Sequence, residues 1–226
     1  MNKKIFITGT GTDVGKTYVT ALLIKSLREK GVNAGYYKPV ATGAVKSNAQ
    51  TIIHDAEYVK TVAELKEDAE NMVSYAYEYP ASPHLSSRLE HDPPCLEKIL
   101  TDCKTRFQQY EYLVIEGAGG LVCPLNIGGK RLMLTDVIKS LKADLLVVVP
   151  SALGAINAAV LTAFYAQKMN ITVKGFILNN AHKDSLIEKD NAKTIETLTK
   201  IPVLMTLEKN AANICLPENL LAALDI

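Results

Sequence analysis

Short, almost uninterrupted apolar runs recur along this chain of 226 residues and alternate with longer segments of helical periodicity. The apolar runs predict strands over 5–7, 34–38, 112–115, 145–149, 173–178 and 202–204. The segments between them predict helices over 16–30, 94–109, 135–142, 154–169 and 186–199. Strands that are apolar on both faces are typical of parallel sheets covered by helices on each side. We therefore expect an α/β protein in which residues 1–226 form a single doubly wound domain with a mostly parallel sheet.

The charge balance and the cysteines restrict the partners and the compartment. Lysine and arginine number 25 against 24 acidic residues, which argues against a nucleic-acid partner held by a broad basic field. The amino-terminal apolar run is too short for a signal peptide, and the most apolar stretch, 143–166, is interrupted by polar residues and Pro150. The four cysteines lack the spacing of a zinc site. These features predict a cytoplasmic protein with reduced thiols and no membrane contact.

A glycine-rich turn links the first predicted strand to the first predicted helix. It consists of Gly9-Thr10-Gly11-Thr12-Asp13-Val14-Gly15-Lys16-Thr17. In such a turn the backbone N–H groups point at phosphate oxygens, and the start of the helix adds partial positive charge. Lys16 would neutralise the β- and γ-phosphates and Thr17 would contribute a magnesium ligand. The spacing between the glycines is one residue longer than in the usual motif, so a plain strand-to-helix turn is the alternative.

Two acidic residues are candidates for the shell of a magnesium ion. Glu116 directly follows the predicted strand 112–115, where a carboxylate can reach the metal, and an exposed strand end is its alternative. The glycines after it leave room for the backbone to approach a ligand. Asp55 lies in a polar stretch before a helical pattern, and on its own it is more typical of a helix N-cap.

A lysine and a proline-flanked serine come next. Lys38 ends the second predicted strand, where it can stabilise charge that develops on a transferred phosphoryl group. A solvated lysine at a strand end is the alternative. The segment 80–84 contains two prolines around Ser82 and predicts a rigid loop.

Four segments in one order carry a resemblance to a known family. They are the turn from Gly9 to Thr17, Tyr37-Lys38-Pro39-Val40-Ala41-Thr42-Gly43, Ser82-Pro83-His84, and Glu116-Gly117-Ala118-Gly119-Gly120. Together they resemble the dethiobiotin synthetase family, the ATP-dependent ring-closing enzymes of biotin synthesis, which share a fold with other P-loop NTPases. The similarity runs from residue 3 to about 202, and the longer phosphate loop is itself a feature of that family.

The resemblance implies a reaction that joins CO2, supplied by bicarbonate, to 7,8-diaminopelargonic acid with ATP and Mg2+. One amine captures CO2 as a carbamate, the γ-phosphate activates it as a mixed anhydride, and the second amine closes the ring. Catalytic roles are implied for Lys16, Lys38 and Thr12, and magnesium ligation for Thr17, Asp55 and Glu116. Substrate contacts are implied for Lys38, Thr42 and Ser82. Nucleotide contacts are implied for Gly9, Thr12, Asp13, Val14, Gly15, Lys16, Thr17, Tyr18, Asp55, Glu116, Gly117, Ala118, Gly119, Asn179 and Asn180.

The resemblance also implies a homodimer. In the family, the segment matching Gly154, Ile156 and Asn157 comes from the neighbouring subunit and binds the substrate carboxylate, which suits the start of a helix. From the sequence alone, a tightly packed helix start with small residues is the alternative. A departure lies at 205–208, which the resemblance aligns with a base-packing loop after the last strand but which lacks glycine and proline. We therefore expect loose base recognition, with selectivity for ATP open.

Three other functions compete with this interpretation. A P-loop partitioning ATPase would usually carry a second lysine in the turn, where this chain has Gly11. A GTPase would need a base-reading Asn-Lys-x-Asp motif, which the stretch after 178 lacks. Another small amidoligase would use the same phosphoryl activation on a different acid.

Overall fold

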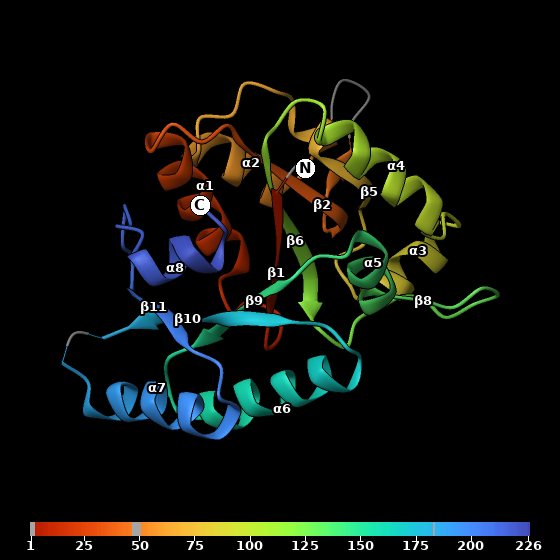
Figure 1. Cartoon of the computed structure of the whole chain (residues 1–226). Helices are drawn as coiled ribbons and strands as arrows, with labels where there is room; N and C mark the ends of the chain where they lie inside the picture. Colours follow the sequence, from red (N-terminus) through yellow and green to blue (C-terminus); the bar gives the residue numbers. More distant parts are fainter. Residues whose placement is uncertain (1–2, 47–50, 183) are drawn as a thin grey trace.

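The computed structural model describes residues 3–46, 51–182 and 184–226. Within these residues a seven-stranded sheet crosses the middle of the molecule (Figure 1). From one edge to the other its strands are β11 (Val203–Glu208), β10 (Val173–Ala181), β9 (Leu145–Pro150), β1 (Lys3–Gly9), β6 (Tyr112–Gly120), β2 (Ala34–Thr42) and β5 (Val73–Tyr77). Each of its strand pairings is parallel. The predicted α/β class with a mostly parallel sheet is thereby confirmed.

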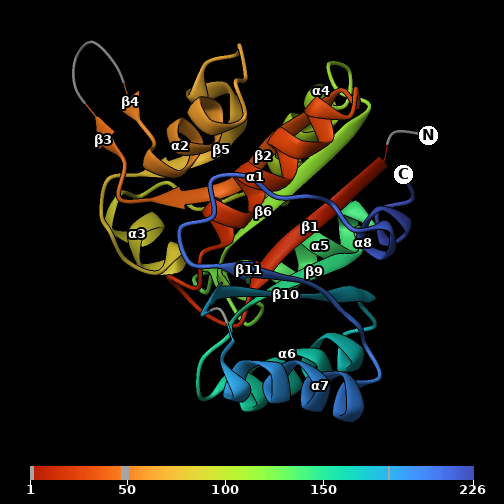
Figure 2. The same cartoon turned by 90° about the vertical axis from the view of Figure 1, so that its left-hand side faces the viewer.

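Helices cover both faces of this sheet. They are α1 (Lys16–Glu29), α2 (His54–Val62), α3 (Pro83–Leu89), α4 (Leu96–Arg106), α5 (Leu134–Leu141), α6 (Ala155–Lys168), α7 (Leu186–Thr199) and α8 (Glu218–Ala223), with a short 3-10 helix at Ala69–Met72. Short antiparallel pairs add β3 (Val45–Lys46) with β4 (Thr51–Ile52), and β7 (Pro124–Asn126) with β8 (Leu132–Met133). Helices α6 and α7 lie side by side beneath β10 in both views (Figures 1 and 2). No helix in the described ranges is long and apolar enough to cross a membrane.

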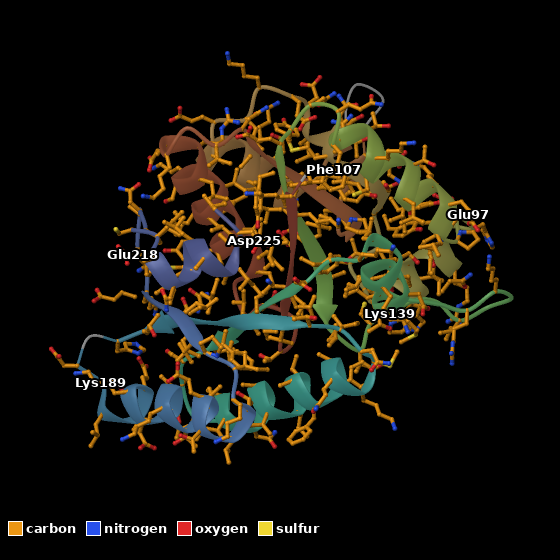
Figure 3. All side chains as sticks on the ribbon, viewed as in Figure 1. Glu97, Phe107, Lys139, Lys189, Glu218 and Asp225 are labelled. Carbon is orange, nitrogen blue, oxygen red and sulfur yellow. The ribbon has the colours of Figure 1, made fainter. Side chains whose placement is uncertain are left out.

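The alternation of side chains along the strands divides the core into two layers. In β1, Ile5 and Ile7 pack in the layer under α1, α2 and α8, whereas Phe6 packs in the layer under α4, α5, α6 and α7. Because side chains of a strand alternate between its faces, an uninterrupted apolar run supplies both layers. In Figure 3 the labelled Glu97, Lys189 and Glu218 lie on the outside of their helices, away from this apolar interior.

The structure differs from the prediction in the segment around the two prolines. Residues 80–82 lie in a loop, as predicted, but 83–89 form α3, so that Ser82 is the N-cap of a helix that the prediction lacked. Pro83 occupies the first helical position, where its missing N–H has no helical partner to lose and its φ suits a helix. Pro83 therefore marks the start of a helix.

The two edges of the sheet and the carboxyl end also depart from expectation. The edge strand β5 was not predicted because it is short and carries tyrosine and serine instead of an aliphatic run. Residues 205–208 lie inside β11, not in a loop after the last strand. The segment that follows the last strand is therefore 209–217, which leads into α8.

Leu23 offers a test of the core. Leu23 in α1 is fully buried, whereas Leu186 in α7 is 82% exposed. We expect Leu23→Ala to lower the free energy of unfolding by about 2–5 kcal/mol, because it leaves a cavity in the core. The matched change Leu186→Ala should shift it by no more than about 0.5 kcal/mol. Urea unfolding of both variants measures this difference, and equal midpoints would contradict the assigned packing.

The four cysteines should react with thiol reagents in two classes. Cys95 and Cys215 are exposed, whereas Cys103 and Cys123 are buried. Burial raises the pKa of Cys103 to about 12 and that of Cys123 to about 11, so neither forms the reactive thiolate near neutral pH. Titration of the native protein at pH 8 should modify Cys95 and Cys215 rapidly, and the other two only after unfolding. Peptide mass mapping identifies the modified residues.

Candidate nucleotide-binding and catalytic site

The glycine-rich turn lies between β1 and α1 at the carboxyl edge of the sheet. Gly15 precedes α1 with φ of +91°, and a Cβ at this position would come within 2.0 Å of the Asn179 amide nitrogen. Only glycine fits there, both in conformation and in space. β1 is central, with β6 on one side and β9 on the other. In parallel sheets ligands bind at the carboxyl ends of strands where the chain connections diverge, and the turn occupies such a point.

Lys16 is held within this turn. Its side chain is largely buried and its Nζ donates a hydrogen bond of 2.8 Å to the Gly11 carbonyl oxygen. Burial lowers the pKa of Lys16, and the nearby Lys38 ammonium lowers it further. A positive group at this position concentrates charge where the backbone N–H groups of a phosphate-binding turn point.

A fully buried carboxylate, Glu116 of β6, is the centre of the site. One of its oxygens accepts hydrogen bonds from the Thr17 hydroxyl at 2.7 Å and from the Lys38 ammonium at 2.6 Å. Its other oxygen accepts a hydrogen bond of 3.1 Å from the Tyr36 hydroxyl. A buried charge needs such partners, since an unpaired carboxylate away from water costs several kcal/mol. The alternative of an exposed strand end is wrong for Glu116.

The strand register explains how Lys38 reaches Glu116. β2 pairs with β6 up to Tyr37 opposite Ile115, and from Lys38 onward it pairs with β5 instead. Lys38 and Glu116 are therefore the first residues beyond the last pair, and their side chains meet where the two strands separate. Lys38 lies within β2 and is 3% exposed, so the alternative of a solvated strand-end lysine is also wrong. Burial alone would lower the pKa of Lys38, but Glu116 and Asp55 outweigh it and raise that pKa.

Asp55 supplies the second carboxylate. Its oxygen lies 2.6 Å from the Lys38 ammonium, and its side chain is 42% exposed. Burial would raise the pKa of Asp55, yet Lys38 lowers it below its usual value. Asp55 is the second residue of α2 and Ile53 is the N-cap, so the helix-cap interpretation of Asp55 is wrong.

Thr17, Asp55 and Glu116 come from three elements: both carboxylates contact the Lys38 ammonium, and the Thr17 hydroxyl donates to Glu116. Two carboxylates and a hydroxyl are hard oxygen donors of the kind that Mg2+ binds together with phosphate oxygens. In the described residues, this site included, no group of three or more His, Cys, Asp or Glu side chains is placed to hold a metal ion, so a cation here would need the hydroxyl and phosphate oxygens as well. The donor set thus fits a magnesium ion that shares its shell with a nucleotide.

A cavity of about 650 Å³ joins these groups. Twelve of the predicted residues line it: Thr12, Asp13, Gly15, Lys16, Thr17, Tyr18, Lys38, Thr42, Asp55, Glu116, Ala118 and Gly119. The phosphate loop forms one end and the end of β2, with Thr42, forms the other. A cavity of this volume is typical of small-molecule binding sites.

Nine predicted residues lie outside the lining of this cavity: Gly9, Val14, Ser82, Gly117, Asn179, Asn180, Gly154, Ile156 and Asn157. A Cβ at Gly117 would come within 2.9 Å of the Phe6 ring, so the glycine there serves packing. Asn179 is buried, and its amide nitrogen donates to the Val14 carbonyl at 3.0 Å. Gly154 and Asn157 are exposed at the start of α6.

The sequence interpretation missed five residues of the site: Tyr36 and the cavity-lining Val40, Ala41, His54 and Tyr58. Tyr36 donates to Glu116, and its place two residues before Lys38 on the same face of β2 was the available signal. His54 and Tyr58 of α2 line the cavity, but the relation of this helix to the phosphate loop is not readable from the sequence.

A larger hollow, of about 810 Å³, lies away from these groups. It is bordered by the β7–β8 hairpin and by α4 and α5. Its lining includes no residue of the phosphate loop, and its Lys130 is paired with Glu97 at 3.5 Å. The buried lysines and the two carboxylates of the candidate site line the smaller cavity instead.

A parallel sheet with a glycine-rich turn, a buried lysine and a hydroxyl at the start of α1 defines the P-loop class of nucleotide-binding α/β proteins. Residues 3–213 match the family described as "AAA domain". The chain is 45% identical to the ATP-dependent dethiobiotin synthetase BioD of Clostridium perfringens, with 92% of each chain covered. It is 42% identical to the protein of that name from Clostridium botulinum, covering 96% of this chain and 95% of the other. The chain belongs to the dethiobiotin synthetase family.

Solved structures share its fold at low identity. A ParA family ATPase from Chlorobium tepidum superposes with a TM-score of 0.55 at 13% identity, over 99% of this chain and 90% of that one. The MinC:MinD cell division complex of Aquifex aeolicus gives 0.54 at 14% identity, over 99% and 85%. These similarities establish the P-loop fold alone.

The Lys38–Glu116 pair should contribute strongly to stability. We expect Lys38→Met to lower the free energy of unfolding by about 3–5 kcal/mol, because it leaves the buried Glu116 carboxylate without its ammonium partner. The double variant Lys38→Met/Glu116→Gln should recover much of the loss. Urea unfolding at neutral pH measures all three proteins.

Lys46→Met provides the matched control. Lys46 pairs with Glu78 at 3.9 Å and with Glu90 at 3.3 Å near the surface, so its loss should cost at most about 1 kcal/mol. Equal destabilisation by Lys38→Met and Lys46→Met would contradict the role given to the buried pair.

Proposed function

We propose that this chain is an ATP-dependent dethiobiotin synthetase that forms the cyclic urea of dethiobiotin from 7,8-diaminopelargonic acid and CO2. The observation that carries the proposal is the presence of two buried lysines, Lys16 and Lys38, in the lining of one cavity. Family membership supports the same activity, since relatives at 45% and 42% identity bear that name. ADP and phosphate are the other products.

The reaction proceeds in three bond changes. A substrate amine attacks CO2 and loses a proton, which gives a carbamate. A carbamate oxygen then attacks the γ-phosphorus of ATP, and the bond to the leaving ADP breaks. The second amine attacks the carbonyl carbon of the mixed anhydride, so phosphate departs and the ring closes. Both nucleophiles belong to the substrate, and the chain needs only to bind, orient and neutralise charge.

The two lysines would reduce the repulsion between the two anions that react. A carbamate and a triphosphate are both anions, and their approach in a partly dehydrated cavity is opposed strongly unless positive charge lies between them. Lys16 would hold the β- and γ-phosphates, and Lys38, released from Glu116 and Asp55, would contact the carbamate and the γ-phosphate. Thr12 would donate to the transferred group, as preorganised donors do at developing charge.

Thr17, Asp55 and Glu116 would hold Mg2+ as part of this proposal. Both carboxylates contact the Lys38 ammonium and the Thr17 hydroxyl donates to Glu116, which fits a cation at this point. A bound magnesium ion supplies neutralisation of the charge on the β- and γ-phosphate oxygens. Within the chain, Tyr36 would keep Glu116 oriented through its hydrogen bond of 3.1 Å.

Asn179 would recognise the base, with Asn180 beside it. The side-chain amide nitrogen of Asn179 donates to the Val14 carbonyl, and the side-chain oxygen Oδ1 of Asn179 is buried without a hydrogen-bond partner among the described residues. A free acceptor suits the amino group of adenine and disfavours the carbonyl oxygen of guanine. Because 205–208 lie inside β11, the segment that could cover the base is 209–217. The remaining predicted nucleotide contacts, from Gly9 to Tyr18 and from Gly117 to Gly119, belong to the same proposal.

The substrate would lie between two copies of the chain. Thr42 lines the far end of the cavity, and Ser82 would join it from the start of α3. Gly154, Ile156 and Asn157 would bind the substrate carboxylate in the cavity of the neighbouring protomer. An exposed apolar surface supports the homodimer: Leu153 is 83% exposed, and Leu161 and Phe164 of α6 are also exposed. Leu161 and Phe164 are three residues apart and so share a face of α6, and exposed apolar side chains gathered on one face are typical of a protein interface.

The organisation and compartment of the protein complete the proposal. We place residues 1–226 in a single functional domain, since one sheet connects all parts of the site. We also place the protein in the cytoplasm, which suits four free cysteines and a biosynthetic activity that needs ATP.

The decisive assay measures ADP release with ATP, magnesium and bicarbonate, with and without 7,8-diaminopelargonic acid. We expect ADP release to depend on the diamine and the product mass to exceed that of the diamine by CO2 minus water. ATP turnover without the diamine would favour the switch ATPase. Turnover with a different acid or amine would favour another amidoligase.

A pair of variants tests the role of Lys38 in the same assay. We expect Lys38→Met to lower kcat by about 100-fold or more, since it removes a positive group from the site of charge development. Lys46→Met, which changes a surface lysine of the same type, should retain full activity. Far-UV circular dichroism at the assay temperature must first show that both variants are folded. Undiminished activity of folded Lys38→Met would refute the role.

A further inference from the structure

The loop between β9 and α6 is held from below by a side chain that the proposed chemistry does not use. Asn191 of α7 is buried, and its amide nitrogen donates to the Ser151 carbonyl at 2.9 Å and to the Ala152 carbonyl at 3.3 Å. The Ser151 N–H in turn donates to the backbone carbonyl of Asn179 at 2.9 Å. The first half of the loop is thus fixed from α7 and from β10.

Beyond Ala152, residues 153 and 154 have no such hydrogen bond to the interior among the described residues. Residues 152–154 are exposed, and Gly154 adopts φ of +92° as the N-cap of α6. The Ala152 carbonyl also accepts a hydrogen bond of 3.1 Å from the Ala155 N–H, which closes the turn into the helix. The path of this exposed segment therefore depends on how residues 151 and 152 are held.

The geometry of the peptide bond fixes the direction of the N–H groups that follow the two carbonyls. A trans peptide is planar, and its N–H points opposite to its C=O. When the carbonyls of Ser151 and Ala152 point at Asn191, the N–H groups of Ala152 and Leu153 point away from α7. The first N–H groups of α6 have no partner within the helix and add to the same set of donors.

A carboxylate of α7, that of Glu188, lies near the start of this loop. Glu188 is the acidic residue one turn before Asn191, and it is buried. Its carboxylate accepts hydrogen bonds from the backbone N–H of His182 at 2.7 Å and from the His182 ring at 3.0 Å. Burial would raise the pKa of Glu188, but the hydrogen bonds from His182 lower it, so these partners hold the carboxylate in its ionised form.

We propose that Asn191 is a positioning residue that presents the N–H groups of residues 152–154, 156 and 157 to the substrate carboxylate in the neighbouring protomer's cavity; the Ala155 N–H is already used by the Ala152 carbonyl. This inference rests on the proposed function, because the carboxylate belongs to 7,8-diaminopelargonic acid. Asn191 itself touches neither substrate nor nucleotide. It acts through the Ser151 and Ala152 carbonyls, and its side-chain amide is the one chemical group that the test has to change.

Two variants and one control isolate this contact. Asn191→Asp keeps the size of the side chain but replaces the donor by an acceptor, and Asn191→Ala removes the group. Ile195→Val, one turn further along α7 and buried in the core, weakens the same helix without touching the loop carbonyls. The control separates a specific effect on the loop from general loosening of α7.

Hydrogen–deuterium exchange, followed by mass spectrometry, measures how well the loop amides are protected and does not require an active enzyme. We expect the amides of 151–157 to exchange faster in both Asn191 variants than in the wild type and in Ile195→Val. In the wild type, addition of 7,8-diaminopelargonic acid with a non-hydrolysable ATP analogue should slow exchange in the same peptide. Unchanged exchange in both Asn191 variants would overturn the positioning role.

Steady-state kinetics then test the consequence for the substrate. We expect KM for 7,8-diaminopelargonic acid to rise about tenfold in the Asn191 variants, the effect of losing about 1.4 kcal/mol of binding. KM for ATP and kcat should stay within about twofold, because uniform substrate binding is what is lost. Ile195→Val should match the wild type in all three constants.

The outcomes distinguish this inference from the proposed function. Faster exchange without a rise in KM for the diamine would overturn the substrate role of the loop. Equal rises in both KM values, or a comparable effect of Ile195→Val, would reduce Asn191 to a structural residue. If the wild type releases no ADP in response to the diamine, the proposed function fails and takes the substrate role with it. The exchange data would still decide whether Asn191 holds the loop.

Discussion

The buried carboxylate of Glu116 is the constraint on which the rest of the site depends. A charge with no access to water must be paired, and its three donors come from two elements: Thr17 of α1, and Tyr36 and Lys38 of β2. To bring these donors together, α1 must begin where β1 ends and β2 must lie beside β6. The same contacts that satisfy Glu116 therefore place the phosphate loop, the lysine of β2 and the carboxylates around one cavity.

The order of the strands places contacts of the site on both sides of β1. On one side of β1, β2 leaves β6 after Tyr37 and the cavity opens between them. On the other side, Asn179 contacts Val14 of the phosphate loop and Ser151 of the next loop, and Asn191 supports Ser151 from α7. A continuous set of hydrogen bonds thus connects the nucleotide loop to the loop that we assign to the partner's substrate. Each link is buried, where hydrogen bonds hold direction best.

Much of the fold was predictable because its signals are local. Apolar runs of four to six residues and the glycine-rich turn identified the central strands and the phosphate loop. The edge strand β5 escaped because a strand at a sheet edge needs fewer apolar side chains. The prolines around Ser82 were taken for a loop because Pro83 is compatible both with a loop and with the first position of a helix. Local patterns leave such choices to tertiary packing.

The sequence by itself determined the fold class, the phosphate loop and, through its ordered motifs, the family of this protein. Those features depend on spacing along the chain, on glycine where bulk is excluded, and on apolar periodicity. Only the tertiary structure decided that Lys38 is buried, that Asp55 is a partner of Lys38 and not a helix cap, and that Asn191 reaches the loop after β9. These are contacts between segments that lie 17, 78 and 40 residues apart. Their formation depends on strand order and helix placement, which no local pattern encodes.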